Sequence, residues 1–146
     1  MTAKKDFKIF LLDSNMFSLN IYQQHLANLG YSDTSIFHNT DDCLHALTLN
    51  PDIIFIDHNI NLANGVDILK KIKRFNPDIY VIFFASIDDT DAVVNILKHG
   101  AFDFILRGDN DFKTLDNVIM KVYRVKSLLA KANMTAFKRF DTSRKK

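Results

Sequence analysis

The chain has 146 residues, of which 47% are hydrophobic and 25% charged, a composition typical of one globular domain and not of a disordered segment. Six Lys or Arg residues and one Asp give residues 131–146 a net charge of +5, whereas thirteen basic and sixteen acidic residues give residues 1–130 a net charge of −3. Cys43 is the single cysteine, which excludes an internal disulfide. The apolar run after the basic start stops at Asp13 after four residues, too short for a signal peptide or a membrane span, so we expect a cytoplasmic protein.

Short apolar runs alternate along the chain with segments whose apolar residues recur at spacings of three and four, the periodicity of a helix. Gly30 and Gly100 follow two of these segments, where glycine commonly ends a helix. Asn39 or Thr40 can cap the start of another. The predicted strands, each with the helix markers that follow it, are 8–12 with Leu19, Tyr22, Leu26 and Leu29; 35–38 with Cys43, Leu44 and Leu47; 53–56 with Ile68, Leu69, Ile72 and Phe75; 80–84 with Val93, Val94 and Leu97; and 102–106 with Leu115, Val118, Ile119, Val122, Val125, Leu128 and Leu129.

Five strand–helix units with nearly continuous apolar strands predict an α/β fold, because strands buried on both faces belong to parallel sheets with helices on both sides. Right-handed crossovers then give a doubly wound five-stranded sheet, and at this length we expect the flavodoxin-like strand order 2-1-3-4-5. Ligands bind such a sheet at the carboxyl ends of the strands beside the switch point, here the first and third. The residues that follow Leu12 and Ile56 are therefore the candidates for a functional site.

Asp13 and Asp57 occupy these two positions. Two carboxylates about 5 Å apart repel each other by roughly 3 kcal/mol at an effective dielectric constant near 20. A cation, hydrogen-bond donors or protonation of one partner normally holds such a pair together. Mg²⁺ suits the pair because it prefers oxygen ligands and leaves coordination sites for phosphate oxygens. In the competing interpretation, each Asp only caps the helix after its strand.

A cation follows the fifth predicted strand. The guanidinium of Arg107 can reach over the same pocket and pair with Asp57 or with a bound phosphoryl group. An arginine in isolation would more commonly be a surface charge. Its place at the carboxyl end of a strand, beside two acids on neighbouring strands, favours a role in the pocket.

Three segments resemble the response-regulator receiver domain (CheY-like) family, in matching order and spacing over residues 7–130. Residues 8–14 resemble its first strand and acidic pair, residues 56–65 (IDHNINLANG) its pattern D-x-x-M-P-x-M-D-G, and residues 100–107 (GAFDFILR) its segment G-A-x-x-[YF]-[LIV]-x-K-P. The resemblance implies that Asp57 accepts a phosphoryl group from a histidine kinase.

The resemblance also implies roles for the residues around the acceptor. Asp13, Asp57 and the backbone carbonyl of Asn59 would hold Mg²⁺. Arg107 would stand in for the family's lysine, and Phe104 would occupy the aromatic switch position.

Several positions depart from the family's pattern. Ser14 replaces the second acid after the first strand, and we expect Mg²⁺ to bind weakly, because losing a supporting group commonly costs about 10- to 100-fold in affinity. Ala85 lies where the family has Thr or Ser, so the hydroxyl that would bond the phosphoryl oxygen is missing. Ser86 follows, but neighbouring strand residues point to opposite faces unless the strand end bulges. Arg107 replaces a compact ammonium by a planar fork, and Gly108 replaces a proline.

The predicted function is that of a receiver domain, residues 1–131, phosphorylated on Asp57 in a two-component phosphorelay, slowly or with a weak conformational response. It would be a phosphoacceptor and not an enzyme, beyond assisting its own phosphorylation and dephosphorylation. Expected partners are a histidine kinase or phosphotransfer protein, and an output partner or domain on the face formed by the fourth helix, fifth strand and fifth helix. A homodimer stays open. Residues 132–146 would be a basic tail or linker, for which a solvated extension is favoured over contact with nucleic acid. We expect the domain itself neither to bind nucleic acid directly nor to bind a membrane.

Two other functions stay open. A pseudo-receiver would signal through the same face as a protein-interaction module without phosphorylation, and a small binding module would use the pocket for another anion. Magnesium-dependent phosphorylation of Asp57 would separate the receiver from both. The histidines show no zinc-ligand spacing, and the glycines form neither a dinucleotide fingerprint nor a phosphate-binding loop.

Overall fold

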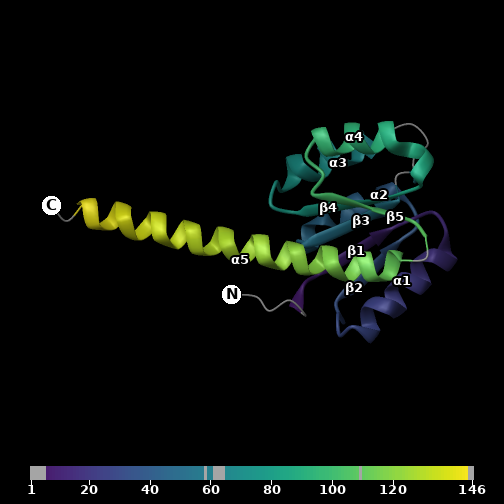
Figure 1. Cartoon of the computed structure of the whole chain (residues 1–146), viewed down its shortest axis with the longest axis horizontal. Coiled ribbons are helices and arrows are strands. Elements are labelled where there is room, and N and C mark those ends of the chain that lie inside the picture. The colour runs from purple at the N-terminus through teal and green to yellow at the C-terminus, as the bar shows by residue number, and fades with distance from the viewer. Residues whose placement is uncertain (1–5, 58, 61–64, 109, 145–146) are drawn as a thin grey trace.

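A computed structural model describes residues 6–57, 59–60, 65–108 and 110–144, with side chains as far as residue 139. Five parallel strands form one sheet in the order β2-β1-β3-β4-β5, which confirms the predicted flavodoxin-like topology (Figure 1). The elements in chain order are β1 (Ile9–Leu12), α1 (Met16–Asn28), β2 (Thr34–Phe37), α2 (Thr40–His45), the 3₁₀ turn η2 (Ala46–Leu49), β3 (Ile53–Asp57), α3 (Gly65–Phe75), β4 (Tyr80–Ala85), the 3₁₀ turn η3 (Ile87–Asp89), α4 (Thr90–Lys98), β5 (Asp103–Leu106) and α5 (Asp111–Arg144).

The strand register brings the predicted site residues to one edge of the sheet. Leu12 of β1 pairs with Ile56 of β3, so Asp13 and Asp57 both come directly after this paired position. Asp57 itself extends β3 by one residue beyond the predicted end and pairs with Phe84 of β4. The carboxyl ends of β1, β3 and β4 therefore meet where the switch-point argument expects a ligand.

Helices cover both faces of the sheet, because alternate strand residues point to opposite sides and nearly all of them are apolar. One buried cluster lies under α1 and α5, and the other lies under α2, α3 and α4 (Figure 1). The central members of the first cluster are Ile9, Leu11, Ile53, Phe55, Ile82, Phe84 and Ile105, and those of the second are Phe10, Leu12, Ile54, Ile56, Val81 and Phe83.

Polar caps and glycines fix the helix ends. The side chain of Asn15 accepts hydrogen bonds from the backbone N–H groups of two residues in the first turn of α1, and that of Asn39 accepts one at 2.8 Å from Asp42 at the start of α2. Asn39 is thus the cap that the sequence left open between two residues. Gly30 and Gly100 end α1 and α4 with φ values of 98° and 104°, a conformation that favours glycine.

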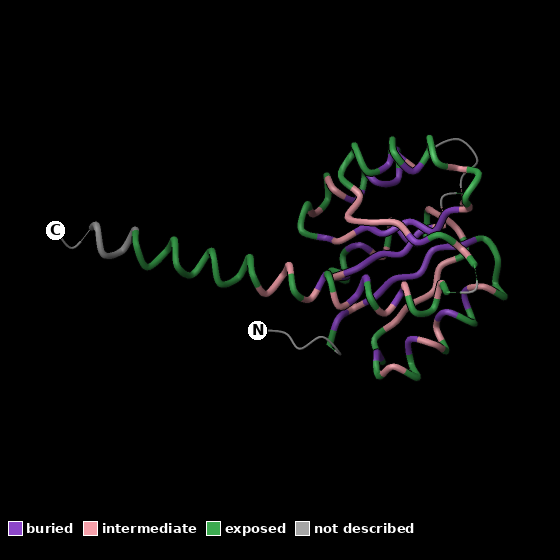
Figure 2. Tube along the Cα trace, viewed as in Figure 1, coloured by how far each residue is buried: buried purple, intermediate pink, exposed green. Residues whose placement is uncertain are grey.

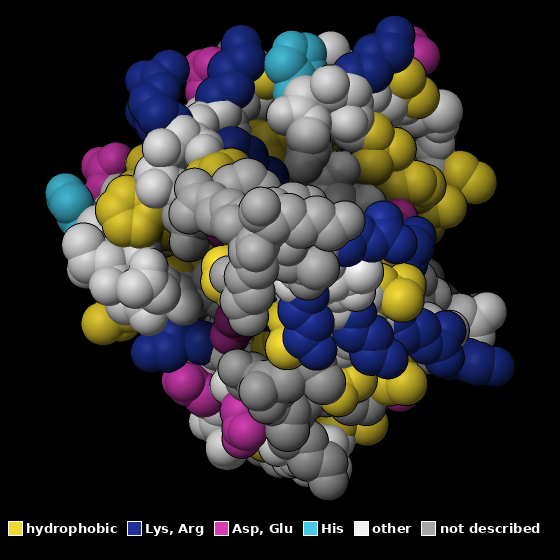
Figure 3. Space-filling model, turned by 90° about the vertical axis from the view of Figure 1, so that its left-hand side faces the viewer, with side chains coloured by type: hydrophobic (Ala, Val, Ile, Leu, Met, Phe, Trp, Pro, Cys, Tyr) yellow, Lys and Arg dark blue, Asp and Glu magenta, His cyan; other side chains and the backbone are white. Residues whose placement is uncertain are grey.

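The last helix continues far past the sheet. α5 contains 34 residues, and its residues 128–139 are all exposed (Figures 1 and 2). Viewed towards its far end, the molecule presents Lys and Arg side chains beside hydrophobic ones (Figure 3). The predicted boundary between residues 131 and 132 falls inside this helix, and the division into domain and tail stays a prediction.

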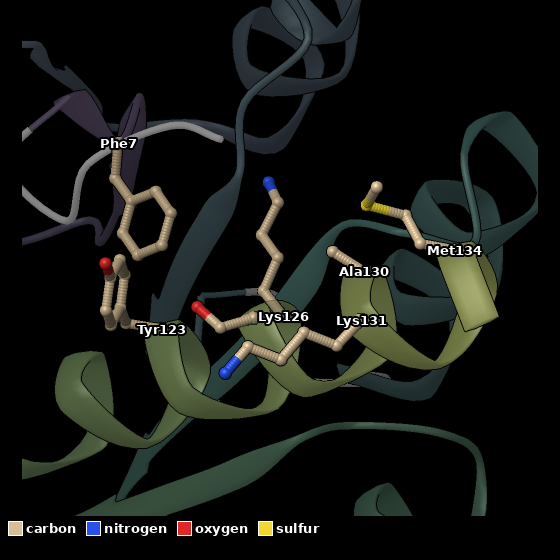
Figure 4. A pocket seen from close by; sticks show the side chains of 7 residues that line it. Phe7, Tyr123, Lys126, Ala130, Lys131 and Met134 are labelled. Atoms are coloured by element: carbon tan, nitrogen blue, oxygen red, sulfur yellow. The ribbon is translucent and has the colours of Figure 1, made fainter.

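A groove of about 520 Å³ lies where α5 leaves the sheet. The rings of Phe7 and Tyr123 line one end of it and Met134 the other, with Lys126 and Lys131 between them (Figure 4). Within the described ranges, no helix is long and apolar enough to cross a membrane.

Candidate functional site

Asp13 is a buried carboxylate at the end of β1. It is 5% exposed, and among the residues that the structure describes it is the one charged residue that is buried. Its Oδ1 accepts a hydrogen bond from the backbone N–H of Asn15 at 2.9 Å. Its Oδ2 lies 2.9 Å from Nη2 of Arg107, which donates to it. A buried charge needs such partners to offset the loss of hydration.

Asp57 reaches the same space from β3. Its side chain is 16% exposed, and its Oδ2 lies 3.8 Å from Nη2 of Arg107. The backbone N–H of Asn59 donates to Oδ1 at 3.4 Å, and the N–H of Ile60 donates to the Asp57 carbonyl at 3.0 Å. The chain therefore turns immediately after the carboxylate, which leaves the carboxylate partly accessible at the rim of the sheet.

Arg107 joins the two carboxylates. It directly follows β5, and its backbone N–H donates to the carbonyl of Ala85 at 2.9 Å, which holds it beside β4. Its guanidinium carbon lies 4.8 Å from the centre of the Phe84 ring. A planar guanidinium has several N–H donors and stacks on aromatic rings, so one side chain can pair with both acids and still pack against the core.

Tyr22 binds the other side of the guanidinium. Nη1 of Arg107 donates to the Tyr22 hydroxyl at 3.0 Å, and that hydroxyl donates to Oδ2 of Asp111 at 2.7 Å. The Tyr22 ring stacks on Phe84 with a centroid distance of 4.6 Å. Burial raises the pKa of Tyr22 far above its ordinary value of 10.0, and the hydrogen bond to Asp111 raises it further, while Arg107 lowers it in part.

The structure thus brings together three of the residues that the sequence singled out, Asp13, Asp57 and Arg107. Two others lie aside: Ala85 is fully buried at the end of β4, and the hydroxyl of Ser86 donates to the carboxylate of Asp89 in the following turn. Of the other predicted residues, Ser14 is exposed after β1 and Phe104 is half-buried in β5. Asn59 contacts the site through its backbone N–H, which donates to Oδ1 of Asp57. Residues 58 and 61–64 of the predicted loop lie outside the described residues.

Two residues of this arrangement escaped the sequence analysis. The helical spacing marks Tyr22 only as an apolar residue of the first helix, and nothing in the sequence pattern singles out Asp111. The hydroxyl on an otherwise apolar helix stripe was the available signal, because a buried tyrosine normally needs a hydrogen-bond partner.

The described side chains do not fit a divalent metal as they lie. The structure contains no group of three or more Asp, His or Cys side chains placed to hold a metal ion within its described ranges. The predicted ligands Asp13 and Asp57 already face the guanidinium of Arg107 at 2.9 and 3.8 Å. A dication between them would be repelled by that positive charge.

Comparisons with known proteins give one family. The model described as "Response regulator receiver domain" matches residues 9–119. The chain is 29% identical over 111 residues to the luminescence regulatory protein LuxO of Vibrio campbellii, which covers 73% of this chain and 24% of LuxO. It is 33% identical over 86 residues to the DNA-binding transcriptional regulator NtrC of Klebsiella pneumoniae, which covers 58% of this chain and 18% of NtrC. The chain thus matches less than a quarter of the length of either relative.

Solved structures agree. A response regulator receiver domain protein from Clostridium thermocellum aligns with a TM-score of 0.76 and 26% identity, over 84% of this chain and 98% of that one. The N-terminal signal receiver domain of a two-component response regulator from Bacteroides fragilis aligns with a TM-score of 0.72 and 27% identity, over 78% of this chain and 93% of that one.

Proposed function

Because the chain belongs to the response regulator receiver domain family, a family of phosphoacceptors, we propose that Asp57 accepts a phosphoryl group from a phosphohistidine in a two-component phosphorelay. The observation that supports this most directly is the position of the Asp57 carboxylate. It lies at the carboxyl end of β3, partly accessible, with Nη2 of Arg107 3.8 Å from its Oδ2. A nucleophile for a phosphoryl group has to be exposed, and a nearby cation reduces the repulsion between the two anions.

In the transfer, a carboxylate oxygen of Asp57 forms a bond to phosphorus while the bond from phosphorus to the imidazole nitrogen of the donor breaks. The imidazole leaves with the electron pair and takes a proton from solvent, and an acyl phosphate remains on Asp57. The guanidinium of Arg107 offsets the charge of the arriving phosphoryl oxygens, because Arg pairs readily with phosphate. The backbone N–H of Asn59, which donates to Oδ1 at 3.4 Å, helps to orient the carboxylate.

The proposed partners follow from the same function. A histidine kinase or a phosphotransfer protein would supply the phosphoryl group in the cytoplasm, and an output partner or domain would bind the α4–β5–α5 face. A hollow of about 440 Å³ beside β5 and the start of α5 is lined by Phe104, Leu106, Arg107, Gly108, Asn110 and Thr114. Leu106 is 43% exposed there, so a partner would meet an apolar side chain directly beside the cation of the pocket.

Intact-mass spectrometry after incubation with acetyl phosphate tests the proposal. We expect a gain of one phosphoryl group in the wild type and none in Asp57→Ala. Asp91→Ala, at an exposed position in α4, is the matched control and should be modified like the wild type. If a folded protein gains no phosphoryl group from acetyl phosphate or from a cognate kinase, the proposal is wrong.

A pseudo-receiver is the second candidate, and one observation favours it. Ala85 supplies no hydroxyl to a phosphoryl group, and the hydroxyl of Ser86 is bonded to Asp89. Under this function the α4–β5–α5 face would bind its partner equally well in the wild type and in Asp57→Asn. A loss of partner binding in Asp57→Asn, or its gain on phosphorylation, would argue against the pseudo-receiver.

A further inference from the structure

The guanidinium of Arg107 lies where two carboxylates converge. Nη2 lies 2.9 Å from Oδ2 of Asp13 and 3.8 Å from Oδ2 of Asp57. Together these three groups carry a formal charge of minus one, so the arginine already neutralises one of the two acids. Ser14 stands where the receiver family places a further acid, and it adds no charge to attract a second cation.

Contacts on its other side hold Arg107 in this position. The Tyr22 hydroxyl accepts from Nη1 at 3.0 Å and is itself bonded to Asp111 at 2.7 Å. The guanidinium carbon lies over the Phe84 ring at 4.8 Å and within 5.6 Å of the Tyr22 ring centre. The side chain is 29% exposed. The two carboxylates and the two aromatic rings therefore stabilise the guanidinium in this position relative to one exposed to solvent.

We propose that Arg107 is the resident cation of this pocket and takes the place of the divalent metal that receiver domains typically bind. Mg²⁺ demands oxygen ligands at about 2.1 Å in octahedral geometry, so it could bind Asp13 only after the guanidinium had been displaced. The protein therefore excludes Mg²⁺ while Arg107 keeps its contacts with Asp13 and Tyr22. One consequence of the exclusion of Mg²⁺ rests on the proposed function: phosphorylation of Asp57 proceeds equally with and without Mg²⁺.

Metal occupancy can be measured directly with Mn²⁺, a paramagnetic stand-in for Mg²⁺, by counting free ion with electron paramagnetic resonance. We expect the wild type to show no saturable binding at millimolar Mn²⁺. Arg107→Gln removes the guanidinium from both carboxylates and should produce saturable Mn²⁺ binding, at least about 10-fold tighter than any binding by the wild type. Arg107→Gln combined with Asp13→Asn should lose that gain. Arg124→Gln, an exposed arginine on α5, is the matched control and should behave like the wild type.

Two outcomes would overturn the proposal. Wild type and Arg107→Gln could bind Mn²⁺ equally, or neither could bind, and in both cases the arginine would not be what excludes the metal. If Arg107→Gln does not fold, the wild type alone decides through the ¹⁵N side-chain resonances of Arg107. A saturable shift on adding Mg²⁺, beyond that caused by NaCl of equal ionic strength, contradicts the proposal, and unchanged resonances support it.

This readout separates the inference from the proposed function. If the protein excludes Mn²⁺ but is never phosphorylated, the phosphoacceptor function is refuted and the role of Arg107 as resident cation is still supported. A protein that is phosphorylated on Asp57 and binds Mn²⁺ with Arg107 intact refutes the resident cation alone.

Discussion

Replacing Tyr22 by Phe removes one oxygen atom from the contacts that hold Arg107. The ring keeps its stacking on Phe84 at 4.6 Å and its edge contact with Phe112 at 5.7 Å. The two hydrogen bonds at 3.0 and 2.7 Å, to Arg107 and Asp111, are lost. Hydrogen bonds to charged groups contribute about 1.5–3 kcal/mol each.

The net loss should be smaller than the sum of two such bonds. Arg107 keeps its contact with Asp13, and Asp111, which is half-buried, can be hydrated instead. We therefore expect the free energy of unfolding to fall by about 1–2 kcal/mol and Tm to fall by roughly 3–8 °C. Urea unfolding at pH 7 measures this, and the slope against urea should not change.

A matched exchange controls for the loss of a hydroxyl as such. Tyr123 lies on α5, as Asp111 does, but contacts neither Tyr22 nor Arg107 through its hydroxyl. Tyr123→Phe should therefore change the free energy of unfolding by less than about 0.5 kcal/mol. A double-mutant cycle of Tyr22→Phe with Asp111→Ala should give a coupling energy of about 0.5 kcal/mol or more, because each change removes one partner of the same hydrogen bond. Wild-type stability of Tyr22→Phe, or strictly additive effects, would refute the account of how Arg107 is held.

Three further predictions use other parts of the structure. Burial raises the pKa of Tyr22 above 10.0 and that of Tyr31 to about 12, so the stability that their neutral forms contribute is complete below pH 10 and lost as pH rises above it. The free energy of unfolding, measured with urea, should therefore fall less between pH 7 and pH 11 in Tyr22→Phe than in the wild type; an equal fall would contradict this. Burial raises the pKa of Cys43 from 9.0 to about 12. At pH 8 a thiol reagent should therefore modify the folded protein about 1,000-fold more slowly than the protein in urea, because the reactive thiolate is that much rarer; equal rates would show that the thiol is accessible. Asp52 pairs with Lys126 at 2.7 Å. Asp52→Asn removes the charge but keeps an acceptor, so it should lower the free energy of unfolding by about 0.5–1 kcal/mol, and by less at high salt; unchanged stability would show that the charge of Asp52 adds nothing.

The sequence was enough to predict the sheet and which candidate residues meet at its edge. Continuous apolar runs identified the strands, and the topology then fixed which strand ends meet. Asp13 and Asp57 could be paired on that basis although they lie 44 positions apart along the chain. Arg107 could be predicted in the same way, because it follows the last strand of the same sheet edge.

Hydrogen bonds between distant side chains could not be predicted in this manner. Tyr22 has the spacing of a core residue in α1, and nothing in the local pattern says that its hydroxyl meets Arg107, 85 positions away. The partner of Ser86 depends on how the chain turns after β4, since its hydroxyl reaches Asp89 in that turn and not the pocket. The pairing of a polar side chain depends on the final geometry, whereas burial depends on periodicity.

The length of α5 carries its far end a long way from the site at which it starts. At 1.5 Å per residue, its 34 residues extend for about 51 Å, and its first residue, Asp111, is bonded through Tyr22 to the arginine of the pocket. A tilt of about 5° at that end displaces the other end by about 4 Å, more than the length of a hydrogen bond. The helix therefore has the geometry of a lever arm, in which a small tilt at Asp111 corresponds to a much larger displacement at Arg144.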